Sequence, residues 1–116
     1  MTPTALHHTS IRVADLARSI PFYEGVLGLR AVPRPELGIA GRWYGIGGSQ
    51  LHLIEGAVPA AAFDPSGPHF ALAVADLDAV RAELRAAGVE MRDLGSNQLW
   101  VRDPDGNVIE LTDAPL

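Results

Sequence analysis

This chain of 116 residues contains no cysteine and no lysine, so two reactive types of side chain are missing from it. The absence of cysteine excludes thiol nucleophiles, Cys-ligated zinc and iron–sulfur clusters. The absence of lysine excludes Schiff-base chemistry and a lysine general base. Metal ligands and acid–base groups therefore have to come from histidine and the carboxylates.

Long apolar runs are also missing. No stretch approaches the roughly 20 apolar residues of a membrane span, and the N-terminus has no basic segment followed by an apolar one. The formal net charge is −5, and the arginines are spread along the chain without forming a cluster. This charge argues against nucleic acid as a partner, because its recognition needs concentrated positive charge. We expect a cytoplasmic protein that binds neither membranes nor nucleic acid.

The composition predicts one ordinary globular domain over residues 1–116. Hydrophobic residues make up 47% of the chain and charged residues 20%, which is enough for a packed core. A domain of this length needs no disulfide or structural metal to fold. Any metal ion in it is therefore expected to serve function.

The chain repeats itself. The segment HTSIRVADL at residues 8–16 recurs as HFALAVADL at residues 69–77, an offset of 61. A second pair, GSQLHLIE at 48–55 and GNVIELTD at 106–113, is offset by 58. Two matches in the same order, with one loop shortened by three residues, indicate an internal duplication.

Each half predicts the same order of elements, β-α-β-β-β. In the first half the strands are expected at 8–13, 28–32, 43–46 and 50–54, with a helix at 16–27 that Pro21 should bend. In the second half a helix follows Asp76, and the later strands are expected at 90–94, 99–102 and 108–112. Asp15 and Asp76 are candidate N-caps, and Gly28 and Gly88 are candidate helix ends. The turn at 103–106 predicts a hairpin.

The remaining segments are rich in proline and glycine and are predicted to be loops. They are residues 33–41, a candidate mobile flap, and residues 56–68. The predicted modules cover residues 5–56 and 67–113, and residues 57–66 link them.

Four side chains fall at matching places in the two halves. His8 and His69 begin the first strand of their halves, while His52 and Glu110 lie in the last strand. Zinc, nickel, iron, cobalt and manganese are all bound by such mixtures of imidazole and carboxylate. The duplication therefore predicts one divalent metal ion with His8, His52, His69 and Glu110 as candidate ligands.

Each of these residues taken alone is more often structural than ligating. The flanking residues favour the ligand interpretation, because His52 and Glu110 each lie between apolar neighbours. If those neighbours face the helices, His52 and Glu110 face the opposite side of the sheet. His7 lies on the other face from His8 and is expected to be structural or exposed.

The segments at 6–16, 19–28, 69–76 and 103–110 resemble the vicinal oxygen chelate superfamily. It includes glyoxalase I, fosfomycin-resistance thiol transferases, methylmalonyl-CoA epimerase, extradiol dioxygenases and bleomycin-resistance proteins. The resemblance covers nearly the whole chain. It implies an α+β fold in which two tandem βαβββ modules form a cup-shaped, half-barrel mixed sheet with the helices outside. It also implies a small-molecule substrate and a homodimer, and it leaves open whether the ligands come from one chain or two.

The resemblance places the metal at the first strand and the last strand of each repeat, which correspond to the four residues named above. Glyoxalase I usually has a carboxylate where this chain has His52. Bleomycin-binding members lack the ligands, so the intact set argues against a binding protein without catalysis. The dioxygenases use two histidines and one carboxylate, which His8, His69 and Glu110 could supply. Their usual tyrosine has Trp100 as its nearest counterpart here, which counts mildly against ring cleavage.

Three functions follow as alternatives. We favour a glyoxalase-like lyase or isomerase, or a thiol transferase, in which Glu110 or His52 moves protons. The second is an Fe(II) or Mn(II) extradiol-type dioxygenase, and the third is a small-molecule binding or resistance protein.

Arg34 in the flexible loop is as consistent with solvent exposure as with substrate contact. Candidate substrate contacts are Arg42, Trp43, Trp100 and Arg102.

Overall fold

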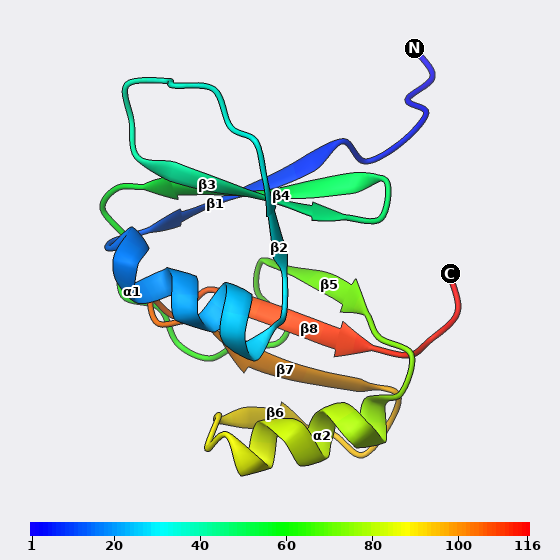
Figure 1. Ribbon diagram of the computed structural model, residues 1–116. Coiled ribbons are helices and arrows are strands. Elements are labelled where there is room, and N and C mark those ends of the chain that lie inside the picture. Colours follow the sequence, from blue (N-terminus) through cyan, green and yellow to red (C-terminus); the bar gives the residue numbers. More distant parts are fainter. The chain divides into compact units, whose positions relative to one another are not determined.

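The computed structural model describes all 116 residues and divides the chain into two compact units, Met1–Pro59 and Ala60–Leu116. Each unit contains one four-stranded mixed sheet, and both repeat the predicted β-α-β-β-β order (Figure 1). The predicted α+β class and the internal duplication are therefore confirmed. None of the helices is long and apolar enough to cross a membrane.

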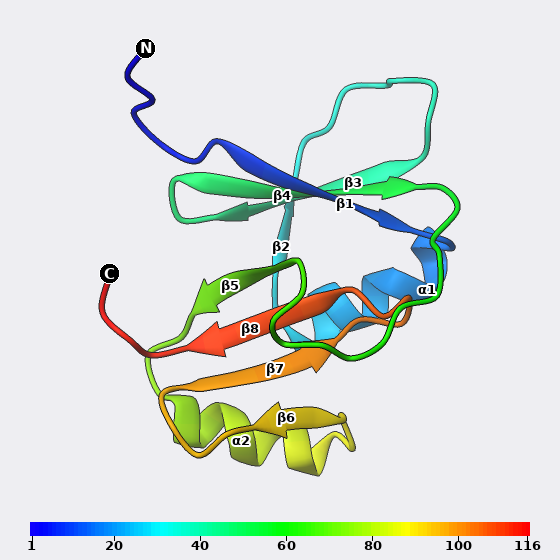
Figure 2. The same cartoon turned by 180° about the vertical axis from the view of Figure 1, so that it is seen from behind.

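The first unit has strand order β1-β4-β3-β2. Its strands are β1 (His8–Val13), β2 (Arg30–Val32), β3 (Gly41–Ile46) and β4 (Ser49–Glu55). The first strand pairs parallel with the last, and the other neighbours are antiparallel. Figures 1 and 2 both show β1, β4 and β3 side by side.

The second unit repeats this topology with the order β5-β8-β7-β6. Its strands are β5 (His69–Ala73), β6 (Met91–Asp93), β7 (Gln98–Arg102) and β8 (Val108–Thr112). Again the first and last strands pair in parallel. The helix α2 (Leu77–Ala86) begins at Asp76, whose carboxylate accepts the amide proton of Ala79 at 3.1 Å. This bond satisfies one of the free amides at the helix start.

The helix of the first unit is shorter than predicted because it changes type at Pro21. The α-helix α1 (Leu16–Ile20) passes directly into a π-helix, η1 (Pro21–Val26). Proline supplies no amide proton, so the regular ladder of bonds to the fourth preceding carbonyl is interrupted. The amide of Leu27 then reaches the Phe22 carbonyl, five residues back. The predicted bend is thus a local widening of the helix.

The second strand of the first unit starts two residues later than predicted, for the same reason. The amide of Leu29 still donates to the carbonyl of Tyr23, in the π-helix, at 2.9 Å. Gly28 has φ of +67°, a conformation that ends helices and that glycine adopts without strain. The chain becomes free to pair with β3 only from Arg30 onward.

Alternation along the strands divides each sheet into two faces. In β4, Leu51 and Leu53 are fully buried and point to one side. In β8, Ile109 and Leu111 do the same. The residues between them, His52 and Glu110, therefore point to the opposite face. We call this second surface the polar face of each sheet.

The apolar face of the first sheet is tied to η1 by a buried tyrosine and an ion pair. The guanidinium of Arg42 donates two bonds to the Glu24 carboxylate, at 2.6 and 3.1 Å, and the Tyr44 hydroxyl donates a third at 3.1 Å. The bond from Arg42 is the largest cause of a lowered pKa for Glu24. Burial, followed by the bond to Glu24, raises the pKa of Tyr44 to about 12.

The raised pKa of Tyr44 predicts a loss of stability at alkaline pH. Between pH 10 and about 12 the unfolded chain releases the phenol proton while the folded chain retains it, so the free energy of unfolding falls as the pH rises. Tyr44→Phe should remove the part of the fall in unfolding free energy that comes from the Tyr44 phenol. Urea denaturation midpoints of both proteins from pH 8 to pH 11.5 measure it, and parallel pH curves would contradict the assignment.

Candidate metal half-sites

The polar face of the first unit presents His8 and His52 as a stacked pair. Their ring centroids lie 4.2 Å apart with the ring planes inclined by 16°. On the other side of His52, Trp43 stacks at 4.0 Å and 5°. Trp43 is also the backbone partner of His52 in β3. The rings of His8 and Trp43, from the two strands that flank β4, therefore hold the His52 imidazole between them, and only 7% of that residue is exposed.

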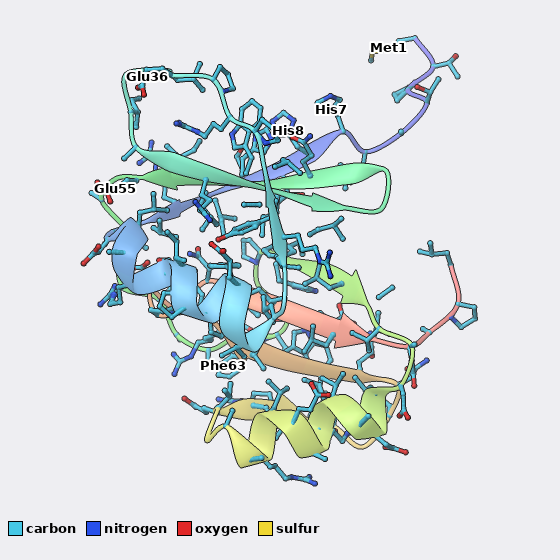
Figure 3. All side chains as sticks on the ribbon, in the orientation of Figure 1. Met1, His7, His8, Glu36, Glu55 and Phe63 are labelled. Carbon is cyan, nitrogen blue, oxygen red and sulfur yellow. The ribbon has the colours of Figure 1, made fainter.

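Polar neighbours direct the ring nitrogens of this pair. The Nδ1 atoms of His7 and His8 lie 2.8 Å apart, which leaves Nε2 of His8 for a ligand. Figure 3 shows both histidines at the start of β1. Nε2 of His52 lies 2.8 Å from Gln50 Oε1. In the tautomer in which that nitrogen donates to Gln50, the lone pair of His52 is on Nδ1.

The polar face of the second unit presents His69 and Glu110 in direct contact. Nε2 of His69 lies 3.1 Å from Oε2 of Glu110, although 41 residues separate them in the chain. Gln98 donates from Nε2 to the other carboxylate oxygen, Oε1, at 2.6 Å. Glu110 is only 8% exposed, so its carboxylate has a fixed position on the sheet.

The contact between His69 and Glu110 fits two ligands of one metal ion. Nδ1 of His69 lies 2.8 Å from the carbonyl oxygen of Gly67, which can only accept a proton. With the ring proton on Nδ1, Nε2 directs its lone pair at a carboxylate oxygen, so a proton or a metal ion has to lie between them. Ligand atoms that bind one ion at about 2.0–2.1 Å lie about 2.9–3.4 Å from each other.

The four predicted ligands are thus found as two pairs, one in each unit. No group of three or more His, Asp or Glu side chains in the structure is arranged to hold a metal ion. Each pair combines groups that zinc, nickel, manganese, cobalt and iron accept. Each unit therefore carries a pair of side chains whose chemistry fits a divalent cation.

The two predicted tryptophans occupy equivalent positions. Trp43 pairs with His52 across β3 and β4, and Trp100 pairs with Glu110 across β7 and β8. Each tryptophan therefore lies on the polar face beside the candidate ligand from the last strand. Trp100 is 6% exposed, and its indole N–H is buried without an acceptor.

The two predicted arginines lie apart from the ligand pairs. Arg42 immediately precedes Trp43 in β3, so it points to the apolar face, where it binds Glu24. Arg102 lies on the polar face of the second unit and donates to Glu90 at 3.0 Å. Its guanidinium also stacks over the ring of Phe63, with 4.8 Å to the ring centroid. The guanidinium of Arg42 already donates two hydrogen bonds to Glu24, so Arg42 is not among the proposed substrate contacts.

A model of the Glyoxalase/Bleomycin resistance protein/Dioxygenase superfamily matches residues 5–111. The chain belongs to this superfamily. It is 30% identical to "Glyoxylase I 4" of Arabidopsis thaliana over 93% of this chain and 70% of that protein. It is also 32% identical to a lactoylglutathione lyase of Haemophilus influenzae, over 89% of this chain and 87% of that protein.

A solved structure has the same fold. The trypanothione-dependent glyoxalase I of Leishmania major matches with a TM-score of 0.74 and 29% identity, over 96% of this chain and 87% of that chain. The family predicted from the sequence segments is therefore confirmed. Members of the superfamily act on small molecules and generally use a divalent metal.

Two residues that contact the candidate ligands, Gln50 and Gln98, are not among the residues predicted from the sequence. Arg34, for which the sequence leaves solvent exposure and substrate contact open, lies over the polar face. Gln50 precedes His52 by two residues, and this spacing places both on one face of a strand. That signal was present in the sequence. Gln98 has no such signal, because its contact depends on the register of β7 against β8.

His52 should remain neutral at lower pH than an ordinary histidine. Burial is the largest cause of its lowered pKa, followed by the charges of His8, His7 and Arg34. The unfolded chain takes up this proton first, so the contribution of His52 to stability is present above pH 6.5 and is lost as the pH falls. An NMR titration of the imidazoles in metal-free protein, with His52→Gln for assignment, checks the direction. Titration of His52 at or above pH 6.5 would contradict it.

Proposed function

We propose that this chain is a divalent-metal-dependent lyase or isomerase of the glyoxalase type. The contact between His69 Nε2 and Glu110 Oε2 carries the proposal, because it pairs a metal ligand with a carboxylate able to move a proton. The names of two relatives, each at least 30% identical over most of this chain, support the same reaction class. The substrate is a small molecule with two oxygens on adjacent carbons.

His8, His52, His69 and Glu110 are the proposed ligands of one zinc, nickel, manganese, cobalt or iron ion. When bound, such an ion polarises the two substrate oxygens as a Lewis acid and stabilises the negative charge that develops on one of them. The sequence repeat supports a shared ion, because it places the His8–His52 pair and the His69–Glu110 pair at equivalent positions. His52 alternatively serves as an acid–base group beside the ion.

Glu110 is the proposed proton carrier. Its carboxylate removes the proton from the hydroxyl-bearing carbon beside the substrate carbonyl and returns it to the former carbonyl carbon. The hydroxyl proton passes to the former carbonyl oxygen, so the product is an isomer and no external oxidant or reductant is needed. Gln98 keeps Oε1 occupied and thereby directs Oε2 toward His69. The lowered pKa of His52 keeps its imidazole neutral near pH 7, the form that ligates a metal or accepts a proton.

A dioxygenase is the second candidate. His8, His69 and Glu110 form the two-histidine, one-carboxylate combination of non-haem iron oxygenases. In that case His52 is a neighbouring acid–base group rather than a ligand. Iron as the resident metal with oxygen uptake on a catechol would favour this reaction over the isomerase.

The metal proposal predicts one equivalent of a divalent transition metal per site. Elemental analysis of protein purified without a metal-affinity tag, then after reconstitution with zinc and nickel, measures it. His69→Ala and Glu110→Ala should each lower the affinity by at least about tenfold, because each removes one ligand. Glu83→Ala, which removes an exposed carboxylate from α2, is the matched control and should retain the metal. A parent protein that takes up no metal would overturn the enzyme assignment and favour a binding protein.

The lyase proposal predicts turnover of the hemithioacetal formed from methylglyoxal and glutathione, or from another thiol in its place. Glu110→Gln preserves the shape of the side chain but removes its basicity, so kcat should fall by about a hundredfold or more. Absorbance of the thioester product and an oxygen electrode are followed together. Oxygen consumption with iron, and no thioester with any metal, would replace the lyase by the dioxygenase.

The homodimer implied by the resemblance can be tested with the same variants. Light scattering after gel filtration gives the mass in solution. If each metal is shared between two copies, mixing the double variant His8→Ala/His52→Ala with His69→Ala/Glu110→Ala should restore about a quarter to a half of the metal content. If each site belongs to one chain, the mixture should restore none.

A further inference from the structure

Arg34 has a fixed position on the polar face of the first unit. It lies in the loop between β2 and β3, and its Nη2 donates to the carbonyl of Ile39 at 2.8 Å. A methyl group added at Gly41 would lie 2.8 Å from Nη2 and 2.9 Å from Cζ of Arg34. The guanidinium therefore rests directly on the backbone of Gly41, where only glycine leaves room for it.

The guanidinium has bonding capacity that the chain does not use. Its Nε–H is buried and has no acceptor. The carbonyl of Ile39 occupies Nη2 alone. A buried donor without a partner costs free energy that an acceptor from a ligand would recover. The planar fork of arginine matches a carboxylate, whose two oxygens accept parallel bonds.

The position of Arg34 relative to His52 follows from the strand register. Gly41 and Trp43 lie two residues apart in β3 and therefore on the same face of the sheet. Two residues of a strand span about 7 Å between Cα atoms. Trp43 is the partner of His52 and stacks on its ring. The charge of Arg34 also contributes to the lowered pKa of His52. The guanidinium therefore lies on the same face of the sheet as the His52 imidazole, over the residue two places before its stacking partner Trp43.

We propose that Arg34 is a specificity-determining residue that binds a carboxylate of the substrate, carried on a short chain beyond the oxygens that chelate the metal. The proposal rests on the proposed function, since it assigns the substrate class of the same site. It narrows the substrate from any chelating molecule to a chelator with a carboxylate on a short chain.

The test compares two hydroxamates that have the same pair of chelating oxygens. Acetohydroxamate is the bare chelating group, and succinohydroxamate (N-hydroxysuccinamic acid) adds a carboxylate on a two-carbon chain. Isothermal titration calorimetry measures the Kd of each for the zinc-loaded protein. The proteins are the parent, Arg34→Gln, Arg34→Lys and the control Arg30→Gln, which removes the same charge from the exposed strand β2 of the same hairpin.

The parent should bind succinohydroxamate at least about tenfold more tightly than acetohydroxamate, because a charge-assisted pair of hydrogen bonds is gained. Arg34→Gln should abolish this preference and leave the Kd of acetohydroxamate within about twofold. Arg34→Lys should retain part of the preference, since lysine keeps the charge but lacks the fork. Arg30→Gln should behave as the parent.

The titrations distinguish a failure of the proposal about Arg34 from a failure of the proposed function. If the parent binds both hydroxamates with the same Kd, Arg34 does not bind a carboxylate and the proposed function stands. The same conclusion follows if Arg34→Gln still binds succinohydroxamate more tightly than acetohydroxamate. If Arg34→Gln weakens the binding of both hydroxamates by the same factor, Arg34 only holds its loop in place through the bond to Ile39. If the parent holds no zinc, or the zinc-loaded parent binds neither hydroxamate, the proposed function falls and the substrate class with it.

Discussion

The candidate site depends on the parallel pairing of the first and last strands in each unit. This pairing brings residues about 40 positions apart in the chain onto one surface, as with His69 and Glu110. A parallel pair requires a long connection, which the helix and the two intervening strands provide. The apolar residues that alternate with the ligands anchor the strands, so the ligands are carried on the rigid part of each unit.

The two repeats have diverged in chemistry while keeping their geometry. The last strand carries a histidine in one unit and a glutamate in the other, and a tryptophan lies opposite each. In the first unit, stacked rings and a contact with Gln50 hold His52, whereas in the second unit Gln98 holds Glu110 by a hydrogen bond. The first unit presents two imidazoles and the second unit an imidazole and a carboxylate, which are the groups that the proposed metal ion and the proposed proton transfer require. Duplication followed by divergence thus accounts for two units that share a topology and differ in the side chains on their polar faces.

The apolar face of the first sheet is organised around a different kind of interaction. Glu24 accepts three hydrogen bonds from Arg42 and Tyr44, and it does so from a π-helix. The π-helix exists because Pro21 interrupts the regular ladder of helical bonds. A single proline therefore places Glu24 against the sheet, where its carboxylate pairs with the guanidinium of Arg42.

The sequence by itself determined the superfamily, the duplicated β-α-β-β-β order and the face on which His8, His52, His69 and Glu110 lie. These are local properties, since alternation, capping residues and repeated segments are read along the chain. Only the tertiary structure decided the partners. Arg42 and Trp43 are neighbours in sequence but point to opposite faces, Gln98 reaches Glu110 through the strand register, and Arg34 meets Gly41 through the path of a loop. Such contacts depend on register and packing, which no window of neighbouring residues contains.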